Sequence, residues 1–291
     1  MIKLDLAHKN FIQQLEDQGR SKSTLIAYGK DIEQLVDHLQ KKGINLITDI
    51  ELGHLEEFMK KLANENYTPK SISRKTNSTK TFFRFLKEAG HIVDNVADFL
   101  KHPKVEIKAP RILTKLEYRA LRDAARDDVR TFAIIEVLLQ TGVTISELAD
   151  INVSDLQVEK ETGSLSIPKK SSKDGRTIPL NKAAVEAVKK YLDQERPRID
   201  DSRHLFITKT GKPLLVRNIR STMERYFKLA GVEKAKVNDL RHTFVAHHLS
   251  QGTNLLFISK IAGHKRISTT ERYLQYIERV EVEEKTELGV L

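Results

Sequence analysis

The sequence predicts a mainly α protein of two domains, in which an all-helical N-terminal domain precedes an α+β domain with a small β-hairpin. Its 291 residues exceed one ordinary domain, since domains typically hold about 100 to 200 residues. Apolar residues recur at helical spacing along most of the chain and alternate with polar residues only near residues 165–180. With 39% hydrophobic and 31% charged residues, the chain is expected to form packed cores beneath a solvated surface.

The first hundred residues predict four short amphipathic helices separated by turn signals. Each helix carries a stripe of apolar residues at three- and four-residue spacing. The stripes start at Phe11, Leu25, Leu55 and Ile72. The third helix is expected to follow Thr48, and the fourth to start after Thr68-Pro69. We assign residues 1–102 to this helical domain.

A basic linker is predicted at residues 103–112. Pro103 and Pro110 lie close together there, in a stretch without helical periodicity. Residues 113–291 then form the second domain.

Two helices are expected at the start of the second domain. Thr114 and Glu117 form a capping box, a pattern in which each side chain bonds the other residue's backbone N–H at a helix start. A further helix covers residues 131–140 and ends at Gly142, since glycine commonly follows the last helical residue.

The periodicity then changes to that of a β-hairpin. Residues 165–167 and 176–180 alternate between apolar and polar positions and flank a polar turn that contains Asp-Gly. Helical patterns return at residues 182–192, 216–230 and from about 238 onward. The hairpin and the helices together predict an α+β domain.

The charge balance favours a polyanionic partner. Fifty Lys and Arg residues against 40 Asp and Glu give a net charge of +10. The fourth helix is strongly basic, since residues 66–87 contain six basic residues and no acidic one. We therefore expect double-stranded DNA as a partner, with a solvated helix face on a merely basic enzyme as the simpler alternative. The candidate phosphate contacts are Lys70, Arg74, Lys75, Lys80, Arg217 and Arg220.

Several function classes find no support in the sequence. No apolar run approaches the roughly 18 residues that a membrane span needs, and the N-terminus lacks the apolar core of a secretory signal. The absence of cysteine suits a reducing compartment, so we expect a cytoplasmic protein without a membrane partner. His242, His247 and His248 lack the His-Glu-x-x-His arrangement of a zinc site, and no glycine-rich phosphate loop is present. We therefore expect neither a metal nor another cofactor.

Residues suited to binding a phosphate cluster in the last third of the chain. Asn238 and Arg241 lie three residues apart and so share one helix face. His264 follows Gly263, and Ser268 with Glu271 forms a capping-box pattern that predicts a helix just beyond it. Tyr273 would lie in the second turn of that helix. A guanidinium, an imidazole and a phenol brought together in this way form a plausible phosphate site.

The order and spacing of these stretches resemble the tyrosine recombinase (phage integrase) family, particularly its Xer-like members. The resemblance also covers Thr141 to Leu148, the hairpin that ends at Leu180, and the nine-residue step from His264 to Tyr273. It implies a helical core-binding domain followed by a tyrosine-recombinase catalytic domain. It also implies DNA strand exchange without metal or nucleotide, through a 3′-phosphotyrosyl bond that conserves the energy of the broken linkage.

The resemblance assigns catalytic roles to individual residues. Tyr273 corresponds to the nucleophile, Arg241 to the second arginine and His264 to the later histidine. Lys170 corresponds to the hairpin lysine. Because the turn is one residue longer than usual, Lys169 and Lys173 remain alternatives for that role.

Two positions depart from the family pattern. Thr144 stands where the first arginine is usual, and Asn238 stands where histidine or lysine is usual. Losing one donor to a developing oxyanion typically costs about 3 to 4 kcal/mol of transition-state stabilisation. We expect slow or absent cleavage unless another cation, such as Arg130 or a second hairpin lysine, moves in. The simpler structural interpretations are a capping box for Thr144 with Glu147 and an N-cap for Asn238.

Three functions remain open at this point. The leading one is a site-specific recombinase or integrase that acts through Tyr273. The alternatives are a catalytically inactive DNA-binding relative and an enzyme that nicks or relaxes DNA through the same tyrosine. The resemblance implies a homo-oligomer, dimeric on paired half-sites and tetrameric in synapsis. The five acidic residues between Glu278 and Glu287 suggest a solvated tail or a segment that docks on a neighbouring subunit.

Overall fold

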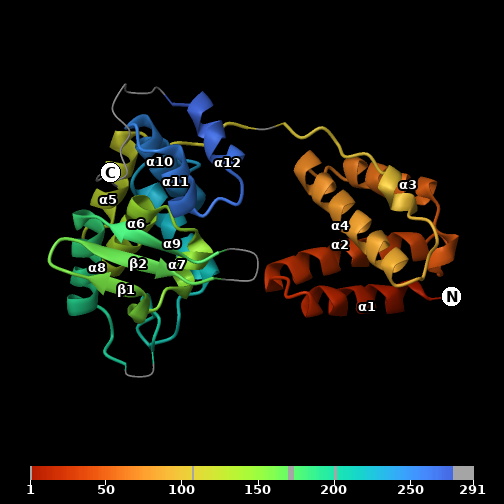
Figure 1. Ribbon diagram of the computed structural model, residues 1–291, viewed down its shortest axis with the longest axis horizontal. Coiled ribbons are helices and arrows are strands. Elements are labelled where there is room, and N and C mark those ends of the chain that lie inside the picture. Colours follow the sequence, from red (N-terminus) through yellow and green to blue (C-terminus); the bar gives the residue numbers. More distant parts are fainter. Residues whose placement is uncertain (1, 107, 170–173, 200–201, 278–291) are drawn as a thin grey trace. The chain divides into compact units, whose positions relative to one another are not determined.

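The computed structural model describes residues 2–106, 108–169, 174–199 and 202–277, and it divides the chain into two compact units (Figure 1). The N-terminal unit is Met1–Lys108 and the C-terminal unit is Ala109–Leu291, so the division falls inside the segment predicted to be a linker. Helices dominate both units, and the second contains one small sheet. The predicted fold class is confirmed.

The N-terminal unit packs four helices around an apolar core (red to yellow in Figure 1). Phe11 and Phe82 are buried and meet edge to face, with ring centroids 5.2 Å apart. Burying a side chain of this size contributes about 1.5 to 3 kcal/mol, which explains why the apolar stripes bring the helices together. The elements are α1 (Leu4–Asp17), α2 (Lys22–Gln40), η1 (Ile47–Asp49), α3 (Leu52–Asn64), α4 (Pro69–Glu88) and η2 (Val96–Phe99).

The start of α4 agrees with the prediction from the sequence, whereas the start of α3 does not. Helix α4 begins at Pro69, and the hydroxyl of Thr68 accepts a hydrogen bond from the backbone N–H of Ser71, as its sequence predicts. Helix α3 begins at Leu52 and not directly after Thr48, because Thr48 lies inside the 3-10 turn η1.

The middle of α4 has a polar interior that the basic pattern does not reveal. Asp31 of α2 is buried and accepts hydrogen bonds from the Lys75 ammonium at 2.9 Å and the Ser78 hydroxyl at 3.0 Å. It also pairs with Arg74. Only 3% of Lys75 is exposed, because a buried carboxylate needs cationic and hydrogen-bonding partners. The prediction that Lys75 contacts a phosphate is therefore wrong.

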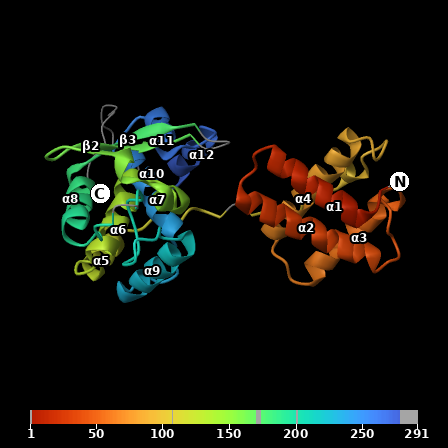
Figure 2. The ribbon, with the colours of Figure 1, turned by 90° about the horizontal axis from the view of Figure 1, so that it is seen from below.

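The C-terminal unit surrounds two central helices, α6 and α10. In Figure 2 the sheet lies along one side of this unit and α5 and α9 along the other, with α6 and α10 between them. Nearly every residue of α6 after its first turn is buried, and Gly142 ends the helix as predicted. The elements are α5 (Lys115–Ala124), α6 (Val129–Thr141), α7 (Ile145–Asp150), η3 (Val153–Asp155), β1 (Leu156–Val158), β2 (Gly163–Ile167), β3 (Arg176–Leu180), α8 (Lys182–Gln194), α9 (Val216–Leu229), α10 (Val237–Ser250), α11 (Leu255–Ala262), α12 (Ser268–Glu271) and η4 (Arg272–Gln275).

The sheet is antiparallel with the order β1-β2-β3. Strands β2 and β3 are the predicted hairpin, with Leu165 opposite Ile178, whereas β1 is too short to show an alternating pattern and was not expected. Burial alternates along β3, so that Arg176 shares the inward face with Ile178 and Leu180. This register directs a guanidinium into the interior, toward the site described below.

Within the described parts of the chain, no helix combines the length and apolar character that crossing a bilayer requires.

Candidate active site

Helix α10 provides the platform of the site. Leu240 and Phe244 are fully buried, as predicted, and anchor the helix in the core. The helix begins at Val237, so Asn238 lies in its first turn and is not the N-cap, contrary to the alternative that its sequence suggested. Because the core holds α10 on most sides, the polar side chains along its remaining face have fixed starting positions.

Arg241 extends from α10 toward the end of α6. It is 8% exposed, and its guanidinium donates a hydrogen bond to the carbonyl of Gly142. Gly142 has a φ of 61°, and a Cβ there would lie 2.4 Å from the Phe244 ring, so only glycine fits between α6 and α10. Burial lowers the pKa of Arg241 and the nearby carboxylate of Glu147 opposes that shift, yet an arginine remains cationic at neutral pH.

Tyr273 lies in the 3-10 turn η4 and is 5% exposed. The capping box predicted from Ser268 and Glu271 is wrong: Ile267 precedes the helix, and the N–H of Glu271 bonds to the carbonyl of Ile267. Burial raises the pKa of Tyr273, while the positive charge of Arg241 lowers it. The phenol is therefore neutral at pH 7 and lies within the electrostatic reach of the guanidinium.

His264 reaches the same site from the loop after α11. Its Nδ1 lies 2.7 Å from the hydroxyl of Thr270, and its ring is nearly parallel to that of Tyr273, at 13° with centroids 6.4 Å apart. The fold thus brings Arg241, His264 and Tyr273 together, although they come from three separate segments.

Thr144 starts helix α7, where its capping-box interpretation is confirmed. Its hydroxyl accepts a hydrogen bond from the N–H of Glu147, and a Glu147 carboxylate oxygen lies 2.8 Å from the backbone nitrogen of Thr144 and 2.9 Å from its hydroxyl. The partner of the Glu147 carboxylate at position 144 is thus a threonine, whereas the family pattern described above has an arginine there.

Glu147 has a second partner that sequence reasoning missed. Arg176 of β3 donates to both carboxylate oxygens of Glu147, at 2.9 and 3.1 Å, and its Nε donates to the carbonyl of Ile261 at 2.6 Å. A Cβ on Gly263 would lie 2.8 Å from this guanidinium, so the glycine makes room for it. The inward position of Arg176 in an alternating strand is the signal that could have identified it.

The hairpin lysines are only partly described. Lys170 and Lys173 lie outside the described residues. The ammonium of Lys169 lies 3.8 Å from the carboxylate of Asp174, and both side chains are largely exposed. Arg130, the other cation considered as a substitute for the missing arginine, donates to the carbonyl of Ile207 at 3.1 Å.

His242 is the second functional candidate that the sequence interpretation overlooked. Its Nδ1 lies 2.5 Å from the phenolic oxygen of Tyr273, and its Nε2 lies 2.7 Å from Nδ2 of the Asn238 carboxamide. Asn238 and His242 are four residues apart on one helix face, which is the pattern that could have paired them. No group of three or more histidines and carboxylates capable of holding a metal occurs among the residues whose positions are described.

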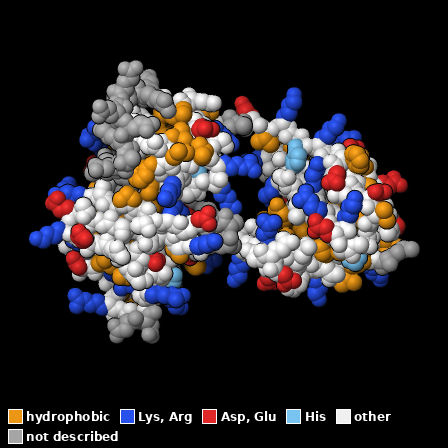
Figure 3. All heavy atoms as spheres, in the orientation of Figure 1, with side chains coloured by type: hydrophobic (Ala, Val, Ile, Leu, Met, Phe, Trp, Pro, Cys, Tyr) orange, Lys and Arg blue, Asp and Glu red, His pale blue; other side chains and the backbone are white. Residues whose placement is uncertain are grey.

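The other candidate phosphate contacts differ in exposure. Lys70, Arg217 and Arg220 are exposed, whereas Lys80 is half-buried and donates to the carbonyl of Asp98 at 3.1 Å. Arg74 is exposed while pairing with Asp31. Figure 3 shows Lys and Arg side chains projecting from the visible face of each unit, with acidic side chains among them.

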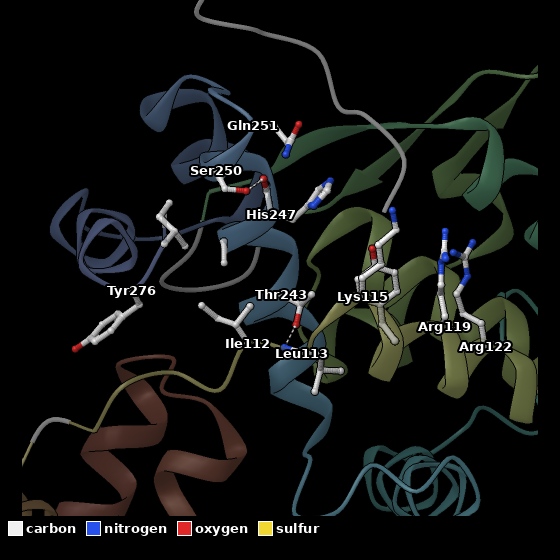
Figure 4. Close-up of a pocket in the computed structure, with 13 residues that line it drawn as sticks. Ile112, Leu113, Lys115, Arg119, Arg122, Thr243, His247, Ser250, Gln251 and Tyr276 are labelled. Carbon is white, nitrogen blue, oxygen red and sulfur yellow. Dashed lines mark hydrogen bonds between the residues drawn. The ribbon is translucent and has the colours of Figure 1, made fainter. Parts of the chain in front are cut away.

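A separate pocket of about 810 Å³ opens beside α5 and α10 (Figure 4). Lys115, Arg119 and Arg122 project into it from α5, and His247 and Tyr276 also line it. Tyr276 is 39% exposed, in contrast with the buried Tyr273 three residues earlier. The two tyrosines therefore occupy different surroundings, and Tyr273 is the one beside His264 and within the electrostatic reach of Arg241.

Comparison with known proteins places both units in one family of DNA-processing proteins. Residues 111–278 match the model of the phage integrase family, and residues 9–90 match that of the phage integrase N-terminal SAM-like domain. Since the first match alone covers more than half of the chain, the chain belongs to the phage integrase family. The resemblance inferred from the sequence is thereby confirmed.

Two relatives show how far the similarity extends. The tyrosine recombinase XerD of Brucella suis biovar 1 (strain 1330) is 29% identical over 300 residues, covering 95% of this chain and 94% of the relative. A tyrosine recombinase of Thermosipho africanus (strain TCF52B) is 31% identical over 273 residues, covering 87% and 89%.

Solved structures with the same fold include two integrases bound to DNA. A lambda integrase dimer bound to a COC′ core site matches with a TM-score of 0.73 and 19% identity, over 97% of this chain and 80% of that one. The Tn1549 transposon integrase in complex with transposon right end DNA matches with a TM-score of 0.74 and 20% identity, over 92% and 94%.

Proposed function

We propose that the protein is a site-specific tyrosine recombinase that cleaves and rejoins DNA through a 3′-phosphotyrosyl intermediate on Tyr273. The observation that carries this proposal is the meeting of Tyr273, Arg241 and His264 in one buried site, with the Tyr273 phenol hydrogen-bonded to His242. A guanidinium fixed beside a neutral phenol is suited to binding the phosphate that the phenol attacks.

In this mechanism the Tyr273 oxygen attacks the phosphorus atom, and the bond from phosphorus to the 5′-oxygen breaks. Arg241 stabilises the negative charge on the non-bridging oxygens, and His264 donates a further hydrogen bond. A hairpin lysine, Lys170 or one of its neighbours Lys169 and Lys173, supplies the proton that the 5′-oxygen takes up. Rejoining reverses these steps, since the phosphotyrosyl bond retains the energy of the original linkage.

DNA recognition in this proposal uses exposed cations of both units. Lys70, Arg74, Arg217 and Arg220 are the candidates that the structure leaves exposed, and Lys80 contributes from a half-buried position. The DNA-bound lambda and Tn1549 integrases support double-stranded DNA as the partner. We extend the proposal to dimers on paired half-sites and tetramers in synapsis, acting in the cytoplasm without a cofactor.

A second function is favoured by one observation. Thr144 caps α7 beside Glu147, where the family usually has its first arginine, and the nearby Arg176 is neutralised by the same carboxylate. The site thus has one fewer uncompensated cation, which favours a relative that holds its DNA site without cutting it. A nicking or relaxing enzyme would use the same tyrosine and differs in needing no synapsis.

Trapping of a covalent adduct tests the leading proposal. A DNA duplex nicked close to the scissile phosphate loses a short fragment after cleavage, so the adduct cannot religate and accumulates. We expect a protein band shifted by the attached strand, absent in Tyr273→Phe and retained in the matched control Tyr276→Phe. Tight, salt-sensitive DNA binding without any adduct would instead establish the binding protein, and supercoil relaxation by a monomer would establish the nicking enzyme.

A further inference from the structure

The imidazole of His242 is held at both of its nitrogens. Nδ1 lies 2.5 Å from the phenolic oxygen of Tyr273, and Nε2 lies 2.7 Å from Nδ2 of the Asn238 carboxamide. The centroids of the His242 and Tyr273 rings are 5.8 Å apart, and the rings are inclined by 45°. Nδ1 of His242 therefore contacts the hydroxyl of the phenol and not its ring face.

The attacking phenol needs a proton acceptor. Burial raises the pKa of Tyr273, so its hydroxyl is protonated at neutral pH and has to lose the proton as it attacks. Burial lowers the pKa of His242, with Arg241 acting in the same direction and Asp239 opposing them. The imidazole is therefore neutral at pH 7 and has one nitrogen with a free electron pair.

Asn238 determines which nitrogen has that electron pair. In the structure Nδ2 of Asn238 faces Nε2, and with the NH₂ group there Nε2 accepts, Nδ1 carries the hydrogen, and the imidazole can only donate to the phenol. If its carbonyl faces Nε2, then Nε2–H donates and Nδ1 accepts from the phenol. The two ends of a carboxamide exchange by a half-turn in the same space, so Asn238 fits both arrangements. Only the second arrangement leaves every N–H of a protonated imidazole with an acceptor.

We propose that His242 accepts the phenolic proton of Tyr273, and that Asn238 positions the imidazole by turning its carbonyl toward Nε2–H. This inference rests on the proposed function. As the bond between the Tyr273 oxygen and phosphorus forms, the phenolic proton moves to Nδ1, and the resulting imidazolium donates to Asn238 and to the phosphotyrosyl oxygen. The electron pair of the broken P–O bond leaves with the 5′-oxygen, which takes its proton from the hairpin lysine. On rejoining, Nδ1 returns its proton to the tyrosine.

The other histidine of the site has a different geometry. Nδ1 of His264 lies against the hydroxyl of Thr270, and its ring is nearly parallel to the Tyr273 ring, with centroids 6.4 Å apart. His264 is thus placed to bind the phosphate, and His242 to take the proton.

The test compares His242→Gln with His247→Gln, because His247 lies on the same helix, is also half-buried and lines the separate pocket. Both are assayed for the rate of adduct formation on the nicked duplex and on a duplex with a sulfur atom replacing the bridging 5′-oxygen. A thiolate leaves without needing a proton, so the second substrate bypasses the acid but not the base. We expect His242→Gln to be slower by about 10²-fold or more on both substrates, and His247→Gln to match wild type.

The pH profile and Asn238 provide the remaining readouts. The wild-type rate should fall as the pH drops through the imidazole pKa, below about 6.5, and His242→Gln should lose this acidic limb. Asn238→Ala should show a smaller loss and Asn238→Asp should move the limb to higher pH, because a carboxylate stabilises the imidazolium. A circular dichroism spectrum and a DNA affinity equal to those of wild type establish that His242→Gln is folded. His242→Asn is the second variant, to be used if His242→Gln does not fold.

Two outcomes would overturn the assignment. A His242→Gln rate within about threefold of wild type would show that the proton goes elsewhere, and recovery on the sulfur substrate would place His242 at the leaving group. A wild-type protein that forms no adduct on either substrate would contradict the proposed function itself, which separates that failure from this one.

Discussion

A single carboxylate organises the positive charges around the Tyr273 phenol. Glu147 lies beside Thr144, binds Arg176 through both oxygens and acts electrostatically on Arg241. Two guanidiniums that share one carboxylate leave about one net positive charge, whereas an arginine at position 144 would add a second. The chemistry available at this site therefore depends on which side chain occupies position 144.

Restoring the family arginine should raise cleavage. In a Thr144→Arg variant, the added guanidinium stabilises the developing phosphate charge, and we expect the rate of adduct formation to increase by about 10² to 10³-fold. The loss of the Thr144 cap should lower the free energy of unfolding by about 1 kcal/mol. The measurement is the adduct rate on the nicked duplex together with a urea titration.

Thr114→Arg is the matched control for this experiment, since Thr114 forms the same capping box at the start of α5. It should lose similar stability and gain no activity. An unchanged adduct rate in Thr144→Arg would show that the missing arginine does not limit cleavage.

Individual residues also show the limits of inference from sequence. The capping boxes at Thr114 and Thr144 were predicted because their partners lie three residues away, within one turn of helix. Arg176 and His242 were missed because their partners, Glu147 and Tyr273, are 29 and 31 residues away, and only the fold brings them together. Local signals identified these two caps but gave wrong caps at Ser268 and Asn238, and the contacts that make a site depend on tertiary structure.

At the scale of elements, α10 combines the core and the site in one helix. One side packs Leu240, Phe244 and Leu249 into the core, and the remaining positions carry Arg241 and His242. Its apolar positions could be predicted from the sequence, as those of α4 could. In α4, however, Lys75 occupies an inward position between Ile72 and Phe82, which a count of basic residues cannot distinguish from an outward one.

Helix α10 should also make the stability of the protein depend on pH. Burial lowers the pKa of His248 to about 3, and it lowers the pKa values of His242 and His247 as well. Below pH 6.5 the unfolded chain binds a proton at His248 that the folded chain does not, until the pH approaches 3. The free energy of unfolding is thus fully retained above pH 6.5 and falls as the pH decreases through this window.

Urea titrations between pH 7.5 and 4.5 measure this dependence. His248 contributes up to about 1.4 kcal/mol per pH unit, so His248→Leu should give a shallower slope than wild type in the acidic range. Equal slopes for the two proteins would show that His248 takes up its proton in the folded state.

At the scale of the whole molecule, the net charge of +10 can attract a polyanion only through the cations that remain exposed. Arg217 and Arg220 project from α9 without a carboxylate partner among the described ion pairs, whereas Lys75 is withdrawn into the N-terminal core. Two domains and their helical character could be predicted from length and periodicity. The particular cations that reach the surface could not, because exposure depends on the packing of neighbouring helices.

DNA affinity should depend steeply on salt, because each phosphate contact releases a counterion. Arg217→Ala should weaken binding at low salt and reduce the slope of log K against log[salt] by about one. Lys182→Ala is the control, since the Lys182 ammonium pairs with Glu161 at 2.7 Å. Fluorescence anisotropy over a range of salt concentrations gives both slopes, and an unchanged slope for Arg217→Ala would exclude this arginine from the phosphate contacts.

The most direct measurement is the identity of the amino acid that carries the DNA strand. Trypsin digestion of the trapped adduct, followed by nuclease trimming and tandem mass spectrometry, yields the peptide that begins at Tyr273 and also contains Tyr276. We predict a nucleotide phosphate on Tyr273, since this phenol bonds to His242, its ring lies beside that of His264, and it is within the electrostatic reach of Arg241. A phosphate on Tyr276, or on any residue outside this peptide, would contradict the account.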